Sequence, residues 1–476
     1  MIHRIFARRR TSRLGLLATL AACCAVSLSA CDSKEILTVS DPDVARPASL
    51  DDPSALPALR AGAIGAFGIA YNGQSSDEEQ VHLSASLGDE FINTETFPTR
   101  IEFDQRAQTI GNTSLVGTFV DMNRARGLAQ RAIAGIQKFA KNSTDSTGLP
   151  EVLALGGLSY VLFAENYCGA VPVSTVNDDG TFNYGPPLTT NQQLDSAVSK
   201  FNAALAVSGS PLTPTFKQLA QVGKGRALLD KGDFAGAAAA VAGVATTFQY
   251  NYQHSETTTG QNNGTWALTT NVGRFGVADR KGGNGLPFQS DGDMKNANFD
   301  PRVANALRPN NGGHGFDNGI PGGELQYVQQ KYPARSSPST IADGVEARLI
   351  EAEAALQTDP NAALTILNAL RSNAALFALR GYATTTSLPP LTLQATKAAQ
   401  VDQLFKERAY WLFLTSHRLG DMRRLIRQYG RTAATVFPTG PYFKGGTYGT
   451  DVNSPVPQRE QNNPNYTPGA CKQDQP

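Results

Sequence analysis

Residues with the chemistry to hold a metal or to attack a substrate are few and scattered. None of the five histidines has a second His or Cys at metal-ligand spacing. The chain contains neither a Gly-x-Ser-x-Gly nucleophile motif nor a Walker phosphate loop. Asp291 and Asp293 form a weak calcium candidate, because the spacing after them does not match a helix-loop-helix ligand set. We therefore expect no cofactor and no resident metal.

Paired carboxylates are the remaining catalytic candidates. A pair such as Asp89 and Glu90 is the residue type that a glycoside hydrolase needs, since that reaction uses two carboxyl groups held at a set distance across a cleft. The chain has 41 Asp and Glu, so adjacent pairs arise by chance. We expect a protein that is not an enzyme, and a lipid-anchored glycoside hydrolase stays as an alternative.

The N-terminus carries the clearest covalent signal. Residues 1–13 are Arg-rich and residues 14–30 form an apolar run of 17 that ends in small residues, as in an export signal. The run is shorter than the roughly 20 residues of a membrane-spanning helix. Residues 28–31, Leu-Ser-Ala-Cys, resemble a bacterial lipobox. We expect removal of residues 1–30, a lipid on Cys31 and a tether over 31–53; the alternative is a plain secretory signal with a chance Cys.

Two cysteines remain once the signal is removed. They are Cys168 and Cys471. Outside the cytoplasm two leftover thiols most simply pair, and a loop of this length would stabilise the fold by roughly 4 to 5 kcal/mol in the chain-entropy model. We predict this disulfide; the alternative is one buried thiol and one thiol in the tail.

The charge balance gives no support for nucleic-acid binding. The first 30 residues hold five Arg and no acid, so residues 31–476 carry 37 basic against 41 acidic groups. Binding to nucleic acid depends on many neutralised phosphates, and no basic patch emerges. We expect no nucleic-acid partner.

The elements that would position any site are predicted to be helices. Apolar residues recur at a spacing of 3.6 over residues 56–71, 115–139, 152–165, 190–205 and 401–419, with a stop at Gly430 and a capping box formed by Thr190 and Gln193. Two further segments, 226–244 and 340–372, each predict a helix hairpin. The Gly232-Asp233 turn resembles that of a tetratricopeptide repeat. The sequence therefore predicts a mainly α fold over about residues 54–476, built on tetratricopeptide-like hairpins.

One long segment breaks this helical pattern. Residues 260–323 contain 14 Gly and 10 Asn without helical periodicity, which predicts an irregular insert over about 260–335. Aromatic residues argue that the insert is ordered. Exposed rings on such loops suit sugars, which stack on aromatic faces, and our candidates are Phe97, Trp266 and Phe275. Burial in the core is the alternative for each ring.

Several segments together resemble the RagB/SusD family of nutrient-uptake outer-membrane lipoproteins. The C-terminal part is the most specific, with Glu407-Arg408, the segment 417–424 and a Pro-Val-Pro end that runs into Glu460, Asn463 and Pro464. The other matching segments are 37–42, 121–123, 165–172, 300–302 and 346–353. Arg408, Arg418, Asp421 and Arg424 recur at helical spacing and predict an ion-pair network that anchors the C-terminal loops.

The resemblance implies a function as well as a fold. It implies a loop-rich ligand face, a glycan or peptide ligand, and a TonB-dependent outer-membrane barrel on which the lipoprotein sits as a lid. It also implies a lipid-anchored location at the outer membrane, and the charged residues after Cys31 resemble surface-export signals of some lipoproteins. A repeat-type scaffold lipoprotein without a small ligand stays as an alternative.

Overall fold

The computed structural model describes residues 50–75, 77–140, 146–177, 181–209, 211–317, 323–380, 382 and 387–476. The chain divides into two compact units, residues 1–50 and 51–476, and all elements below belong to the second. The signal segment 1–30, Cys31 and nearly all of the tether lie outside the described residues. Among the described helices, none has the length and apolarity needed to cross a membrane.

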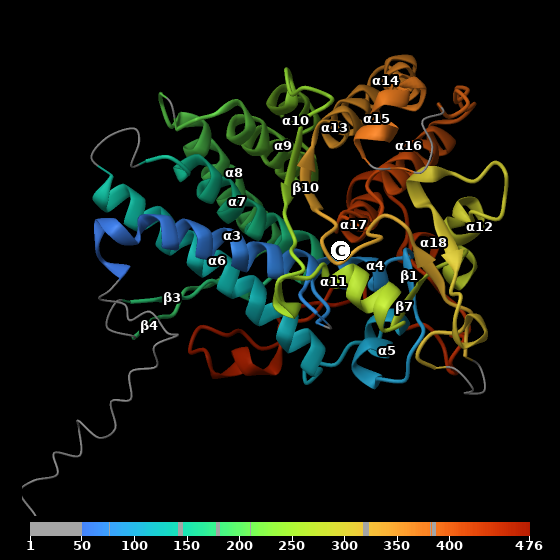
Figure 1. The fold of residues 1–476 in the computed structure, drawn as a ribbon, viewed down its shortest axis with the longest axis horizontal. Helices are drawn as coiled ribbons and strands as arrows, with labels where there is room; N and C mark the ends of the chain where they lie inside the picture. The colour runs from blue at the N-terminus through green and yellow to red at the C-terminus, as the bar shows by residue number, and fades with distance from the viewer. Residues whose placement is uncertain are drawn as a thin grey trace, which may run out of the picture. The chain divides into compact units, whose positions relative to one another are not determined.

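Long helices fill the first half of this unit, and each packs against the next one along the chain (Figure 1). They are α3 (Leu56–Asn72), α6 (Thr113–Phe139), α7 (Leu149–Asn166), α8 (Thr190–Ala206) and α9 (Pro214–Asp230). Four of the five predicted helical windows are therefore confirmed, with one shift in a helix cap. The capping box of α8 uses Thr189 and Gln192. Gln193 is instead buried and donates to the carbonyl of Leu188.

Both predicted hairpins are present and lie against each other. The first joins α9 to α10 (Phe234–Val241), and the second joins α13 (Gly344–Leu356) to α14 (Pro360–Ser372). Helix α13 packs on both α9 and α10, although about a hundred residues separate the hairpins. Within the first hairpin, Gly225 lets α9 pack closely on α10, because a β-carbon there would lie 2.5 Å from Cγ1 of Val241.

The prediction of one last long helix is wrong, because two helices are present. Six residues separate α16 (Lys397–Trp411) from α17 (Arg418–Tyr429). Between them Leu414 and Ser416 adopt positive φ values of 52° and 56°. Tertiary hydrogen bonds hold this turn: the Tyr332 hydroxyl donates to the Leu414 carbonyl and the Arg226 guanidinium donates to that of Ser416. The predicted stop at Gly430 is correct.

The four network residues are buried and fall into two groups. Asp421 accepts from Arg408 at 2.9 Å and from Arg424 at 2.6 Å, and both guanidiniums also pair with Glu353 of α13. Arg418 pairs separately with Asp89 at 2.6 Å. The network therefore ties α16 and α17 to α13 and to the segment after α4 (Gln80–Leu87), whereas the sequence predicted contacts with the C-terminal loops.

Strands are short and pair only two by two. The antiparallel pairs are β1 (Phe91–Asn93) with β7 (Phe275–Val277), β2 (Val171–Pro172) with β5 (Pro187–Leu188), β3 (Thr175–Val176) with β4 (Phe182–Asn183), β6 (Gln249–Tyr252) with β10 (Ser339–Asp343), and β8 (Asn305–Leu307) with β9 (Tyr327–Gln329). The pair β1–β7 joins the insert to the earlier irregular segment that follows α4 (Gln80–Leu87). Both loop regions therefore form one face, on the right of Figure 1.

The remaining helices are brief and lie mostly within this loop-rich part. They are α5 (Pro98–Gln105), α11 (Gly264–Trp266), α12 (Phe288–Gly292), α15 (Ala374–Leu379) and α18 (Ala433–Val436). The C-terminal tail is held at its far end by a disulfide between Cys168 and Cys471, whose α-carbons are 5.3 Å apart across 303 residues of sequence. The bond has the pairing expected from the sequence and fixes the tail beside the end of α7.

Candidate functional site

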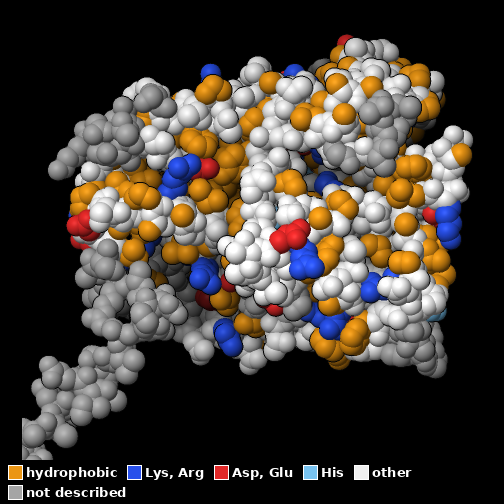
Figure 2. Space-filling model, viewed as in Figure 1, with side chains coloured by type: hydrophobic (Ala, Val, Ile, Leu, Met, Phe, Trp, Pro, Cys, Tyr) orange, Lys and Arg blue, Asp and Glu red, His pale blue; other side chains and the backbone are white. Residues whose placement is uncertain are grey.

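Two exposed phenylalanine rings lie together on the loop-rich face. Phe97 and Phe316 are 45% and 52% exposed, and their ring centroids are 6.4 Å apart in an edge-to-face arrangement. The guanidinium of Arg274 lies over both rings, 4.5 Å from the centroid of Phe97 and 4.0 Å from that of Phe316. We call these three side chains the aromatic platform. Figure 2 shows hydrophobic side chains gathered beside Lys and Arg near α5, at the lower right of the face in view.

Local backbone chemistry places both rings at the surface. Phe97 precedes Pro98, and proline both starts α5 and holds the residue before it in an extended conformation. Phe316 follows Gly315, where a β-carbon would lie 2.5 Å from the carbonyl oxygen of Gly273. The amide of Phe316 donates to the same carbonyl at 2.9 Å. A glycine at position 315 thus lets the two loops approach closely enough to bring the rings together.

A buried carboxylate holds the cation of the platform in place. Glu95 accepts from Arg274 at 2.5 Å and from Arg100 at 3.1 Å, and its side chain has no exposed surface. Burial raises the pKa of the Glu95 carboxyl, while the two guanidiniums oppose that shift. Arg100 also lies 5.5 Å from the centroid of Phe97. The platform is therefore a rigid pair of rings over a fixed cation.

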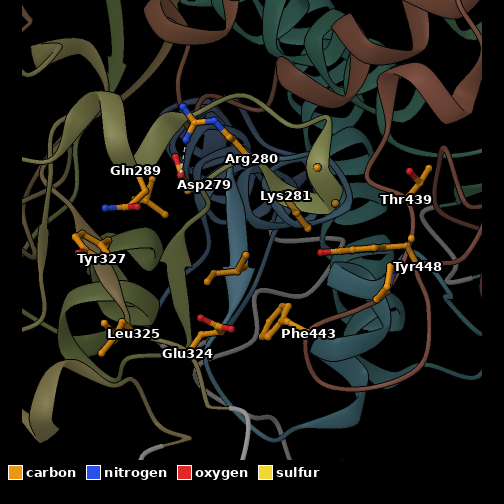
Figure 3. A pocket seen from close by; sticks show the side chains of 16 residues that line it. Asp279, Arg280, Lys281, Gln289, Glu324, Leu325, Tyr327, Thr439, Phe443 and Tyr448 are labelled. Atoms are coloured by element: carbon orange, nitrogen blue, oxygen red, sulfur yellow. Dashed lines mark hydrogen bonds and ion pairs between the residues drawn. The ribbon is translucent and has the colours of Figure 1, made fainter.

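A pocket of about 650 Å³ opens on the same face and is lined by aromatic and polar side chains (Figure 3). We call it the tyrosine pocket. Its rings are Tyr327, Phe443 and Tyr448, and its main polar groups are Asp279, Gln289, Glu324 and Thr439. Lys444, which follows Phe443, donates to the Asp317 carboxylate at 2.8 Å and to the Glu95 carbonyl. Lys444 thus connects the pocket wall to the support of the aromatic platform.

Three separate segments build the pocket. The insert supplies residues from β7 to α12 and the start of β9, β1 supplies Ile92, and the C-terminal segment supplies residues 439–448. In Figure 3 Tyr327 and Tyr448 stand on opposite sides, and Phe443 and Glu324 lie along the lower edge. Tyr448 packs edge to face on Tyr442 at 5.2 Å, and the Tyr442 hydroxyl donates to buried Asp104. The C-terminal wall is therefore anchored from behind.

The three rings predicted to contact a ligand have different surroundings. Phe97 belongs to the aromatic platform, and Trp266 is half-buried with the Arg335 guanidinium 5.5 Å from its ring. Phe275 has no exposed surface; its ring stacks on Phe91 and packs at a tilt on His82, with centroids 5.7 Å from each. The assignment of Phe275 to the ligand face is therefore wrong: β1–β7 pairing turns its ring into the core.

The carboxylates considered for hydrolysis are buried as well. Asp89 is bound to Arg418, and Glu90 accepts from the amide of Leu414 at 2.9 Å. Neither carboxylate is more than 1% exposed, so neither faces a cleft. In the calcium candidate, Asp291 accepts from Lys406 and Tyr410. Among the described residues no group of three or more His, Cys, Asp or Glu is arranged to hold a metal ion.

A second pocket, of about 520 Å³, lies between α12 and α16 and has charged walls. Arg302 pairs there with Asp300 and Glu407 at 2.6 Å each, and Arg371 pairs with the same Glu407 at 2.6 Å. Two of the segments that carried the resemblance, 300–302 and 407–408, therefore meet in one buried ion-pair cluster. This cluster joins the insert to the helices.

No family model matches the chain, and no curated protein matches it. Solved structures match it over most of its length. A SusD-like carbohydrate binding protein from Bacteroides fragilis superimposes with a TM-score of 0.60 at 17% identity, covering 88% of this chain and 99% of that one. The chain has a SusD-like fold. A laminarin binding SusD-like protein gives a TM-score of 0.58 at 15% identity, covering 87% and 99%. A SusD superfamily protein from Parabacteroides distasonis gives 0.59 at 13%, covering 87% and 98%.

The sequence analysis selected one residue of the aromatic platform and missed the other two. It selected Phe97 from the aromatic residues of the irregular segments, and this ring is exposed in the structure. It missed Phe316 and Arg274, which meet only through the approach of two loops at Gly315. It also missed Phe443 and Tyr448. Their only signal is a run of Gly, Pro and aromatic residues after α18, which is typical of an ordered loop.

Proposed function

We propose that this protein is a non-enzymatic lipoprotein that binds a glycan on its loop-rich face and passes it to a TonB-dependent transporter of the outer membrane. The aromatic platform is the observation that carries the proposal. Exposed rings present flat apolar faces for the C–H surfaces of a sugar, and the Arg274 guanidinium beside them donates to hydroxyl groups. Two of the matching folds are described as carbohydrate or laminarin binding, which supports a glycan over a peptide.

The membrane location and the partner rest on other observations. A lipid on Cys31 would anchor the chain through the tether 31–53, as the lipobox resemblance implies. The helix hairpins α9–α10 and α13–α14 offer a rigid surface for the transporter, since stacked hairpins commonly bind protein partners.

Glycan binding is tested with a panel of neutral and charged oligosaccharides, by affinity electrophoresis and then calorimetry. We expect a glycan from the panel to bind, and Phe97→Ala and Phe316→Ala each to weaken it about fivefold, since losing one ring contact removes on the order of 1 kcal/mol. Phe182→Ala is the matched control, because Phe182 is 60% exposed on β4, outside the platform. Equal losses in all three variants, or turnover of the glycan, would contradict the proposal.

The partner is tested separately, by a mild-detergent pull-down of the full-length protein from its native outer membrane, followed by mass spectrometry. We expect a TonB-dependent barrel in stoichiometric amount. A Cys31→Ala variant should leave the membrane fraction, because it lacks the residue that receives the lipid. Recovery with assembly factors instead of a barrel would favour the scaffold alternative.

A further inference from the structure

Aromatic rings form part of the wall of the tyrosine pocket. Tyr327, Phe443 and Tyr448 all contribute to its walls, and Figure 3 shows the hydroxyl of Tyr448 directed toward the middle of the pocket. The face of an aromatic ring carries the negative part of its quadrupole and attracts cations. This protein already uses that attraction: the ammonium group of Lys444 lies 5.6 Å from the centroid of Phe443.

Of the two carboxylates in the lining, one is already satisfied. Asp279 pairs with Arg280 at 2.8 Å and accepts from both the amide and the hydroxyl of Ser290. Glu324 is exposed and has no hydrogen bond or ion pair within the part of the chain that the structure describes. Its charge reaches the pocket, because burial raises the pKa of Tyr448 and the Glu324 carboxylate adds to that shift.

The cations around the pocket are all engaged elsewhere. Lys281 lines the pocket, but its ammonium group points inward, where it pairs with Asp104 and donates to the carbonyl of Gly88. Arg280 is neutralised by Asp279 and Lys444 by Asp317. Across the described lining, Glu324 is therefore the uncompensated charge. The pocket combines three rings with one free negative charge.

We propose that the tyrosine pocket binds a protonated amino group carried by the glycan, so that the preferred ligand contains an amino sugar. The Glu324 carboxylate accepts from the ammonium group, the rings surround it, and Gln289 and Thr439 are placed to bond neighbouring hydroxyls. This inference rests on the proposed glycan function. A glycan is favoured over a basic peptide because the pocket wall at Phe443 is continuous, through Lys444, with the support of the aromatic platform.

The test compares three hexasaccharides that share one β-1,4 backbone and differ only at carbon 2: cellohexaose with a hydroxyl, hexa-N-acetylchitohexaose with a neutral acetamide, and fully deacetylated chitohexaose with an amine. Hexalysine is the peptide arm. Dissociation constants of the full-length protein in detergent are measured by calorimetry at about pH 5.5, below the ordinary pKa range of an amino group. We expect the amine-bearing sugar to bind about tenfold tighter than both neutral sugars, because a charge-assisted hydrogen bond and a cation–ring contact are added.

The variant Glu324→Gln keeps the shape of the side chain and removes its charge. It should reduce the preference for the amine to about twofold or less and leave the affinity for cellohexaose unchanged, since only the ionic part of the interaction is lost. Asp474→Asn removes an exposed carboxylate outside the lining and should keep the full preference. Both variants change an exposed side chain, so the fold stays intact.

Four other outcomes would overturn the amino-sugar inference. Equal binding of the three sugars, or a preference that survives in Glu324→Gln, would overturn the inference and leave the proposed glycan function standing. Binding of hexalysine with none of the sugars would overturn the assignment to a glycan. Failure of all four probes would overturn the inference for this backbone, whereas the proposed function falls only if the wider panel also fails.

Discussion

Two arginines that stack on aromatic rings have opposite surroundings. Arg302 lies 5.3 Å from the centroid of Tyr410 and 5.1 Å from that of Trp411, and all three side chains are at most 2% exposed. Arg274 makes the same kind of contact with Phe97 and Phe316, whose rings are about half exposed. We call Arg302, Tyr410 and Trp411 the buried cluster and compare it with the aromatic platform.

A buried contact between arginine and aromatic rings stabilises the fold, whereas an exposed contact of the same kind remains available to bind a ligand. The rings of the buried cluster are packed against the protein over their whole apolar surface, so they contribute to the free energy of unfolding. In the platform half of each ring still faces water, so burying it against a ligand remains favourable. Substitutions in the two groups should therefore affect different measurements.

The largest effect on the free energy of unfolding should come from Trp411→Ala in the buried cluster. The ring also packs on Phe377 at 5.3 Å and has no exposed surface, so its removal leaves a cavity beside Arg302. We expect the free energy of unfolding in urea to fall by about 3 to 5 kcal/mol. Glycan affinity of the folded protein should not change. Trp411→Phe, which keeps a ring, should lose less, and a weakened affinity in either variant would break the comparison.

Sequence reasoning succeeded where the cause of a structure is local. The helical windows and the α9–α10 turn follow from apolar periodicity and from Gly232-Asp233, which act within a few residues. The turn between α16 and α17 was missed, because Leu414 and Ser416 adopt their backbone angles through bonds to Tyr332 and Arg226, far away in the chain. No pattern within residues 401–419 records those partners.

The site follows the same rule. Phe97 is exposed beside Pro98, whose effect on the backbone is local, whereas Phe275 was misplaced because the direction of its ring depends on pairing with β1. A strand pattern was present, since Phe275 and Val277 alternate around Gly276, and period-two alternation predicts one buried face. Phe316 had no such signal, because the approach of two loops brings it to Arg274.

An effect of intermediate size on stability is expected at Glu90, which lies where the helices meet the loop-rich face. Burial raises the pKa of its carboxyl to about 8, and Oε1 accepts from the amide of Leu414, while Oε2 has no hydrogen bond among the described residues. The folded protein therefore holds a proton that the unfolded chain releases near pH 4.5. This contribution to stability is complete below that pH and is lost as the pH rises through about 8.

Glu90→Gln should remove this pH dependence, because the amide resembles the protonated carboxyl and does not titrate. Between pH 4.5 and 8 we expect the native protein to lose about 1 to 4 kcal/mol of unfolding free energy relative to the variant. Lys331, whose pKa burial lowers to about 7, titrates in both proteins and largely cancels in the difference. Parallel stability curves from urea unfolding across this range would show that Glu90 is ionised in the fold.

The smallest effect on stability should come from the platform itself, in Phe97→Ala and Phe316→Ala. Each ring is about half exposed, so truncation removes little buried apolar surface, and Arg274 keeps its ion pair with Glu95. We expect the free energy of unfolding to change by less than about 1 kcal/mol in either variant, as is usual for surface substitutions. A loss comparable to that of Trp411→Ala would mean that the rings brace the two loops against each other. The platform would then be a structural contact, and the weaker glycan binding of these variants would reflect a displaced loop rather than a lost stacking surface.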